Sequence, residues 1–311
     1  MFPAWLKVKS SAESRGQVAA TLAGLRLNTV CASAECPNLG ACFANGTATF
    51  LIMGAVCTRA CAFCAIGGAK PAAAKSAPSA GPAAADACRI PPPDPTEPAR
   101  LAEAVKLLGL KFAVITSVTR DDLPDGGASF FADAIRTVRA AAPGIGIEVL
   151  TPDFCGDETA LAAVLDAAPT VFNHNIETVR RLSAQVRDKA TYGRSLALLR
   201  AAANYAPLHS PYSIPHSPIY IKSGLMLGLG ETVEEIFETL SDLRAAGVSL
   251  LTIGQYLPPT KSHHPLARFA APEEFADWRE KALALGFTAV ASAPLARSSY
   301  HARELATKTN F

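Results

Sequence analysis

The sequence predicts an α/β protein built on a parallel β-sheet. Six short runs rich in apolar and β-branched residues alternate with stretches of helical periodicity. Such alternation favours a parallel sheet with helices outside it, and near-continuous apolar strands are typical of strands covered on both faces. A β/α barrel and a doubly wound open sheet would both give this pattern. The six predicted strands cover residues 50–54, 112–118, 147–151, 170–176, 219–228 and 250–257.

The clearest helix prediction covers residues 231–246. Thr232 and Glu235 can form a capping box at its start, and Gly247 can end it. An apolar stripe at helical spacing runs through this segment. Two further segments with helical start and spacing signals cover residues 158–167 and 272–285.

Polar residues gather where the predicted strands end. If the strands form a β/α barrel, their carboxyl ends make the reaction face, so these side chains would lie around one site. They are Thr116, Ser117, Asp153, Asn173, Asn175 and Gln255.

Composition limits the possible partners and location. The chain has 311 residues, half of them hydrophobic, and carries 29 basic and 27 acidic side chains. This balance gives no electrostatic case for nucleic acid or anionic lipid as a partner. No apolar run reaches the roughly 18 residues of a membrane helix, and the start lacks a signal-peptide core. We therefore expect a cytoplasmic protein that binds neither nucleic acid nor membrane.

Two segments have the composition of irregular structure. Residues 69–87 are rich in Ala, Pro and Ser and lack apolar periodicity, so we expect a mobile insertion over about residues 68–97. The second segment, residues 206–219, contains four prolines whose spacing forbids a helix. We expect both to be surface loops.

Six of the eight cysteines fall between residues 31 and 64. Without an export signal these thiols should stay reduced, and clustered reduced cysteines indicate metal binding. Cys88 and Cys155 stand alone, and we interpret both as ordinary thiols.

The stretch CTRACAFC places Cys57, Cys61 and Cys64 on one short loop. Three thiolates can hold an iron–sulfur cluster but leave one iron without a protein ligand, where a substrate can coordinate. A closed zinc site needs four ligands and fits poorly, although a structural metal site with a distant fourth ligand remains an alternative.

The spacing C-x3-C-x-aromatic-C, with Phe63 as the aromatic residue, resembles the motif of the radical S-adenosylmethionine (SAM) enzymes. In that family the methionine portion of SAM chelates the fourth iron of a 4Fe–4S cluster. An electron from the cluster then cleaves SAM and produces a 5′-deoxyadenosyl radical that abstracts hydrogen from unactivated carbon. The resemblance implies that Cys57, Cys61 and Cys64 are the catalytic cluster ligands.

The stretch TVCASAECPNLGACF adds Cys31, Cys36 and Cys42, and the whole region from Thr29 to Cys64 resembles the lipoyl synthase family. In that family this first group holds an auxiliary cluster whose fourth ligand is a serine of a C-terminal R-S-S-Y motif. The sequence has RSSY at 297–300, which implies that Ser299 is a metal ligand and catalytic. From the residues alone, RSSY would be a polar tail.

The resemblance covers nearly the whole chain and implies a partial (β/α)6 barrel of the radical SAM type with N- and C-terminal extensions. The extensions would be residues 1–49, with the auxiliary-cluster cysteines, and 291–311, with RSSY; the barrel would be 50–290. Further family motifs follow in order at 115–127, 171–179, 222–231 and 252–260.

The activity implied by the resemblance inserts two sulfur atoms at C6 and C8 of an octanoyl chain, which is linked to a lysine of a lipoyl carrier domain. The implied cofactors are SAM and two 4Fe–4S clusters, of which the auxiliary one supplies sulfur. The implied partners are the carrier domains of 2-oxoacid dehydrogenase E2 or glycine cleavage H protein and an electron donor. We expect a monomer.

Other residues are candidates for contact with SAM. Phe63 would pack near the adenine, although a core aromatic is an equal alternative. The side chains at strand ends could bond to the ribose or methionine portion or only to backbone, and glycines could let backbone approach the ligand. These candidates are Thr116, Ser117, Asn175, Glu177 and Gly228.

Two alternatives remain open. A different sulfur-inserting radical SAM enzyme, similar to biotin synthase, would lack the first cysteine group and RSSY. A structural metal-binding protein would have closed four-thiol sites.

Overall fold

The computed structural model describes residues 3–6, 20–30, 38, 47–66, 90–205 and 219–308. They form one eight-stranded sheet whose spatial order follows the sequence from β1 to β8. The strands are β1 (Asn28–Thr29), β2 (Thr47–Ile52), β3 (Phe112–Ser117), β4 (Gly146–Leu150), β5 (Val171–Asn173), β6 (Tyr220–Leu227), β7 (Leu250–Gln255) and β8 (Ala289–Ser292). The α-helices are α5 (Glu97–Leu107), α6 (Ala128–Ala141), α7 (Glu158–Asp166), α8 (Arg180–Val186), α9 (Tyr192–Asn204), α10 (Val233–Ala245), α11 (Pro272–Ala284) and α12 (Ala302–Lys308). Two 3-10 helices are η1 (Ala4–Leu6) and η2 (Phe154–Gly156).

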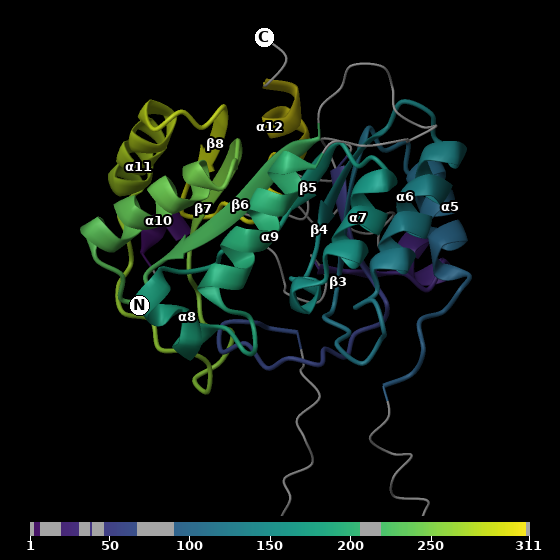
Figure 1. Cartoon of the computed structure of the whole chain (residues 1–311), viewed down its shortest axis with the longest axis horizontal. Coiled ribbons are helices and arrows are strands. Elements are labelled where there is room, and N and C mark those ends of the chain that lie inside the picture. Colours follow the sequence, from purple (N-terminus) through teal and green to yellow (C-terminus); the bar gives the residue numbers. More distant parts are fainter. Residues whose placement is uncertain are drawn as a thin grey trace, which may run out of the picture.

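Parallel pairing runs without interruption from β2 to β8, and β1 pairs antiparallel with β2. Because every strand is followed in space by the next in sequence, right-handed crossovers place the helices on one face of the sheet. The helices flank the strands in Figure 1. The two end strands do not pair with each other in the described residues, so the barrel is partial, as predicted.

The six predicted strands are confirmed, with boundaries that shift by a few residues. β1 and β8 were not predicted, because strands of two and four residues are too short to show a period of two. The barrel therefore has one more parallel strand than the six expected. The predicted insertion lies mostly in residues 67–89, and the proline-rich segment mostly in 206–218, both outside the described residues.

Alternate residues of the strands belong to different hydrophobic clusters. Phe50, Ile115 and Phe172 join the large core between the sheet and its helices. Phe112, Val171 and Leu250 point to the inner face, where they pack with Leu305 of α12. The short C-terminal helix therefore covers the amino-terminal end of the barrel interior.

A buried ion pair lies on the same inner face, where Lys222 is level with Leu250 and Glu148 is level with Val171. Lys222 of β6 donates from Nζ to both carboxylate oxygens of Glu148 on β4, at 2.9 and 3.0 Å. Asn173 of β5 donates to Glu148 as well, at 2.8 Å. Neither charged side chain is exposed, so the pair must be matched within the fold to offset its loss of hydration.

Local signals position the helices as the sequence predicts. Thr232 and Glu235 form the capping box that starts α10, and Gly247 follows its end with φ +85°. A Cβ at Gly247 would lie 2.4 Å from the Cβ of Ala203, so close packing on α9 also requires glycine there. Of the described helices, none has the length and apolar character needed to cross a membrane.

His174, just after β5, is buried in a fixed hydrogen-bond chain. Its Nδ1 lies 2.9 Å from the carbonyl oxygen of Thr151, which can only accept, so Nδ1 carries the proton. Nε2 then accepts from the Ser195 hydroxyl, which itself accepts from Arg187 at 2.6 Å. Burial and the Arg187 charge lower the pKa of His174 to about 4.

This histidine should make stability depend on pH. The unfolded chain binds a proton at His174 below pH 6.5, whereas the folded chain excludes it until about pH 4, so stability falls as pH is lowered through this window. Between pH 7 and 5 the loss should be about 2 kcal/mol. Urea titrations should show that His174→Gln reduces this loss by that amount; equal losses in the two proteins would contradict the assignment.

Candidate active site at the cysteine loop

The cysteine loop, residues 57–64, begins shortly after β2 at the carboxyl edge of the sheet. A sharp turn precedes it, with positive φ at Met53 and Gly54. The turn is held by the buried Glu97 carboxylate, which accepts from the Met53 amide at 2.8 Å. Gly127 makes room for it, because a Cβ there would lie 2.5 Å from the Met53 sulfur.

Backbone hydrogen bonds attach the loop to three neighbouring connections. The Thr58 amide donates to the Thr119 carbonyl after β3 at 3.0 Å. The Ala62 amide donates to Val186 at the end of α8 at 2.9 Å, and the Ala62 carbonyl accepts from the His264 amide at 2.8 Å.

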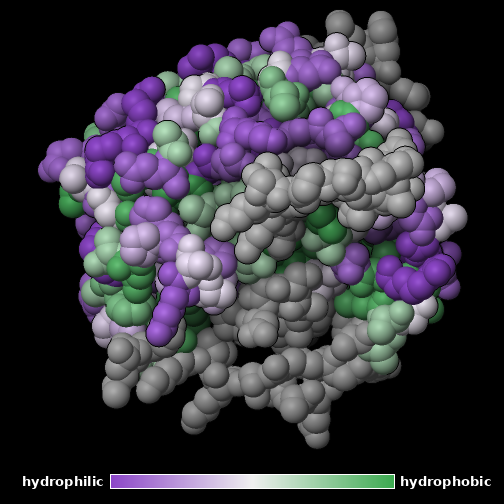
Figure 2. Space-filling view, turned by 90° about the horizontal axis from the view of Figure 1, so that it is seen from below, coloured by the Kyte–Doolittle hydropathy of each residue, from purple (hydrophilic) through white to green (hydrophobic). Residues whose placement is uncertain are grey.

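Side chains add further attachments. Asp188, between α8 and α9, accepts from the Ala60 amide at 2.9 Å. His263, after β7, bonds through Nε2 to the Cys64 carbonyl at 3.0 Å. The loop is therefore held in shape by segments from several parts of the sheet. Figure 2 views this side of the molecule, with hydrophilic residues over much of its periphery.

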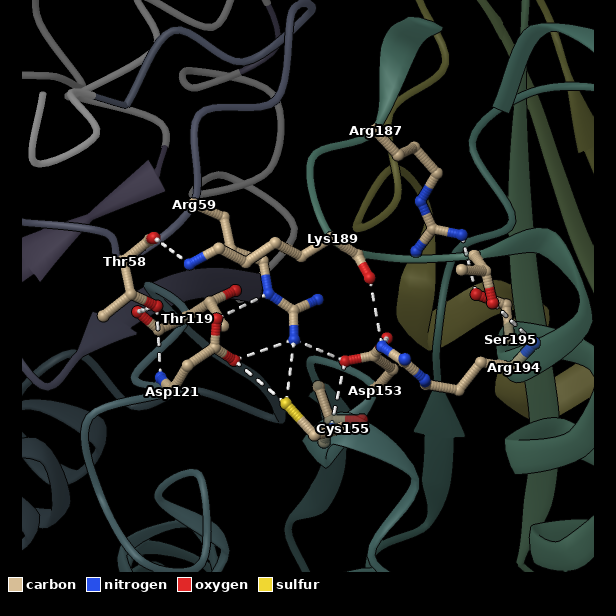
Figure 3. A network of polar contacts seen from close by, with 12 residues as sticks. Thr58, Arg59, Thr119, Asp121, Asp153, Cys155, Arg187, Lys189, Arg194 and Ser195 are labelled. Atoms are coloured by element: carbon tan, nitrogen blue, oxygen red, sulfur yellow. Dashed lines mark hydrogen bonds and ion pairs between the residues drawn. The ribbon is translucent and has the colours of Figure 1, made fainter. Parts of the chain in front are cut away.

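Arg59, inside the loop, is the centre of a buried ionic network (Figure 3). Its guanidinium forms a bidentate pair with Asp121 at 2.9 and 2.8 Å and also donates to Asp153 at 2.6 Å. Arg194 of α9 binds the other oxygen of Asp153 at 3.1 Å. Burial alone would raise the pKa of Asp121 and Asp153, but the hydrogen bonds and charge of Arg59 hold both below the ordinary value.

Cys155 lies at the edge of this network. Its sulfur is 3.6 Å from Arg59 and 3.5 Å from Asp121, and the residue is exposed, with φ +53°. Among the described residues, no contact joins Cys155 to the three loop cysteines. Cys88 lies outside the described residues.

The three loop thiols are half-buried and unbridged. Cys57 Sγ accepts from the amides of Arg59 and Thr119, both at 3.4 Å. Burial raises the pKa of Cys61, and raises that of Cys64 to about 11, so metal binding must displace their protons.

The loop fits an iron–sulfur cluster better than a single ion. Within the described residues, no three His, Cys, Asp or Glu side chains converge on one ion position. In a cluster each thiolate binds a different iron, so its ligands surround the group instead of meeting at one point. Backbone amides directed at sulfur, as at Cys57, also suit a thiolate ligand.

Two of the predicted SAM contacts have unused hydrogen-bonding atoms. Ser117 Oγ and Asn175 Oδ1 are buried and have no hydrogen-bond partner among the described residues. Gly224 leaves the space for Asn175, because a Cβ there would lie 2.7 Å from that oxygen. Thr116 differs, because its hydroxyl already donates to the Leu150 carbonyl at 2.9 Å.

Glu177 lies close enough to the cysteine loop for its charge to act on both Cys61 and Cys64, where it helps to raise the pKa of each thiol. Desolvation raises the pKa of its carboxyl group, although Arg187 and the Asn175 amide counteract this. Arg187 was missed by the sequence analysis. Its largely buried guanidinium bonds to Ser195, acts electrostatically on Cys61, and forms no ion pair with a carboxylate in the described residues.

Phe63 and Gly228 have packing reasons for their identity. The partly buried Phe63 ring packs against the main core. A Cβ at Gly228 would lie 2.3 Å from the side-chain nitrogen Nε2 of Gln255 and 2.6 Å from the carbonyl oxygen of Arg268. Glycine is therefore required there whether or not a ligand approaches. Their contact with SAM stays a prediction.

The RSSY segment lies at the barrel interior. Ser298 accepts from Asn175 Nδ2 at 2.6 Å, and its carbonyl accepts from Lys222 at 2.6 Å. Cys31, Cys36 and Cys42 lie outside the described residues, but Asn38, between the last two, donates to the Leu295 carbonyl at 2.7 Å. This contact places Asn38 next to the segment that carries RSSY.

A family model described as the radical SAM superfamily matches residues 51–243. Solved structures share the fold. Methylornithine synthase aligns with a TM-score of 0.53 at 12% identity, covering 91% of this chain and 79% of that one. SuiB from Streptococcus suis bound to its precursor peptide SuiA aligns with a TM-score of 0.52 at 10% identity, covering 93% and 54%. The family match, together with the shared fold, places this chain in the class of radical SAM enzymes.

Curated relatives narrow this class. A lipoyl synthase from Rubrobacter xylanophilus is 49% identical over 303 residues, which are 97% of this chain and 85% of the relative. A lipoyl synthase from Caldanaerobacter subterraneus is 48% identical over 300 residues, 96% and 95% of the two chains. The chain therefore belongs to the lipoyl synthase family.

The ionic network predicts a large effect of removing Arg59. Arg59→Met would leave Asp153, which has no exposed side-chain surface, without its main partner and should lower the free energy of unfolding by about 3–5 kcal/mol. Urea titration of anaerobically purified protein measures this loss.

Arg136→Met is the matched control, because Arg136 pairs with Asp133 at the surface, where both side chains are more than 40% exposed. It should cost less than about 1 kcal/mol. If both variants lost a comparable free energy of unfolding, Arg59 would not be the centre of a buried, stabilising ionic network.

Proposed function

We propose that the chain acts as a lipoyl synthase that inserts two sulfur atoms, at C6 and C8, into an octanoyl group on a lysine of a lipoyl carrier domain. The observation that carries the proposal is the meeting of two features at one edge of the barrel. The RSSY segment bonds to Asn175 through Ser298, and Asn175 bonds to Glu177, whose charge acts on Cys61 of the three-thiol cysteine loop.

Cys57, Cys61 and Cys64 would hold one 4Fe–4S cluster and leave its fourth iron to SAM. The bound cluster supplies the electron that cleaves SAM and so provides the oxidant for hydrogen abstraction. The protein holds the loop in place through Thr119, Val186 and His264.

The residues around the loop would orient SAM. Ser117 and Asn175 offer unused buried oxygens, which suit donors on the ligand. Arg187 is a buried cation without a carboxylate partner in the described residues, so its charge suits the anionic end of the ligand. Beneath them, α12 closes the barrel interior and limits access of water from the other end.

The second cluster would be held by Cys31, Cys36, Cys42 and Ser299 and would be the sulfur donor. The Asn38–Leu295 contact supports this grouping, because it joins the segment of the first cysteine group to the start of the C-terminal extension. A serine oxygen is a harder ligand than a thiolate and matches iron less well, which would favour release of that iron when sulfur is removed.

The remaining assignments follow from the proposed reaction. The macromolecular partners are octanoylated lipoyl domains, of the E2 or H-protein kind, and an electron donor. We propose a monomeric cytoplasmic enzyme.

Selective loss of each cluster tests the proposal. Cys57→Ala should lower the iron content of anaerobically purified protein by half and abolish 5′-deoxyadenosine formation. Cys36→Ala should lower iron by the same amount and retain SAM cleavage, but mass spectrometry should find no sulfur added to an octanoylated lipoyl domain.

The outcomes separate the alternatives. Loss of all iron from Cys57→Ala with none lost from Cys36→Ala would indicate one cluster and a different sulfur-inserting enzyme. Zinc in place of iron would indicate a structural metal site. Cys155→Ala is the control and should keep both iron and product at wild-type levels.

A further inference from the structure

The C-terminal arm, residues 293–299, turns back from β8 and lies along the end of β7. The Gln255 amide donates to the Pro294 carbonyl at 3.2 Å. One residue before it in β7, Gly254 has no side chain, and a Cβ there would lie 2.2 Å from the Ala296 carbonyl oxygen. The arm therefore packs directly on the strand backbone, and its path depends on glycine at this position.

Ser298 is bonded to the barrel at two points. Its carbonyl accepts from Lys222 Nζ and its hydroxyl accepts from Asn175 Nδ2, each at 2.6 Å. Lys222 is itself fixed by both oxygens of Glu148. A charge-assisted bond to the backbone and a second bond to the side chain leave this residue little freedom.

Ser299 is held through its backbone. Its carbonyl accepts from the Ala302 amide at 3.3 Å, at the start of α12. Among the described residues its hydroxyl makes no hydrogen bond, in contrast to that of Ser298. The backbone is thus fixed on both sides of the Ser299 hydroxyl.

We propose that Ser298 is a positioning residue, through which Lys222 and Asn175 hold the neighbouring Ser299 hydroxyl toward the auxiliary cluster. The adjacent serines then have different roles: one anchors the arm to the barrel, and the other binds iron. This inference rests on the proposed ligand role of Ser299.

Ser298→Ala tests the anchor in anaerobically purified full-length protein that contains both clusters. Loss of one part-buried hydrogen bond should speed release of the auxiliary iron to a chelator, and trypsin cleavage after Arg297, by about fivefold. The iron held by Cys57, Cys61 and Cys64 should leave at the wild-type rate. Ser298→Thr restores the hydroxyl and should restore both rates.

A second variant tests the backbone contact without leaving a buried charge unpaired. Lys222→Met with Glu148→Gln removes the donor to the Ser298 carbonyl, while Asn173 can still donate to the new amide. Release of the auxiliary iron and trypsin cleavage after Arg297 should both be faster than in the wild-type protein. Ser292→Ala is the control, because its hydroxyl bonds to the Phe275 carbonyl and not to the arm, and it should keep wild-type rates.

The results separate failure of the anchor from failure of the ligand assignment. Wild-type rates in Ser298→Ala, with fast iron release from Ser299→Ala, would overturn the anchoring role alone. Wild-type iron release from Ser299→Ala, with fast trypsin cleavage in Ser298→Ala, would overturn the ligand role of Ser299 and with it the proposal as stated.

Discussion

Parallel pairing from β2 to β8 is the constraint on which the rest of the structure depends. Because all seven strands run in one direction, their carboxyl ends meet at one edge, and each connection that leaves this edge can reach its neighbours. The cysteine loop uses this arrangement. It leaves β2, yet its backbone is bonded to residues after β3, at the end of α8 and after β7. No local sequence could hold three thiols in place alone.

Buried charge is used twice to direct backbone. Arg59 joins the cysteine loop to Asp121 and Asp153, and Lys222, paired with Glu148, holds the carbonyl of Ser298. Matched burial of opposite charges contributes little net stability compared with apolar packing. The ion pairs act on geometry instead, because each pair fixes the course of the backbone segment that it binds. The segment held by Lys222 also reaches Asn175, which bonds to Glu177 and to Ser298.

Much of the fold could be predicted because its signals are local. The apolar runs of β3 and β7 and the capping box of α10 are read from neighbouring residues, whereas β1 and β8 depend on pairing partners elsewhere. The cysteines and Ser299 were predicted from motifs. Arg187 was not, because nothing near it in sequence marks it. Ser298 lies within RSSY, but its bonds to Asn175 and Lys222 could not be read from the motif. The Asn175–Ser298 bond joins residues 123 positions apart, and only the folded structure shows it.

The ties around the cysteine loop also bear on which substitutions the protein can tolerate. The loop backbone is bonded to Thr119 after β3, Val186 at the end of α8 and His264 after β7. Displacing any one of these connections would loosen the loop, although each lies far from it in sequence. Because backbone groups make these bonds, the side chains at the three positions can vary as long as the backbone keeps its path.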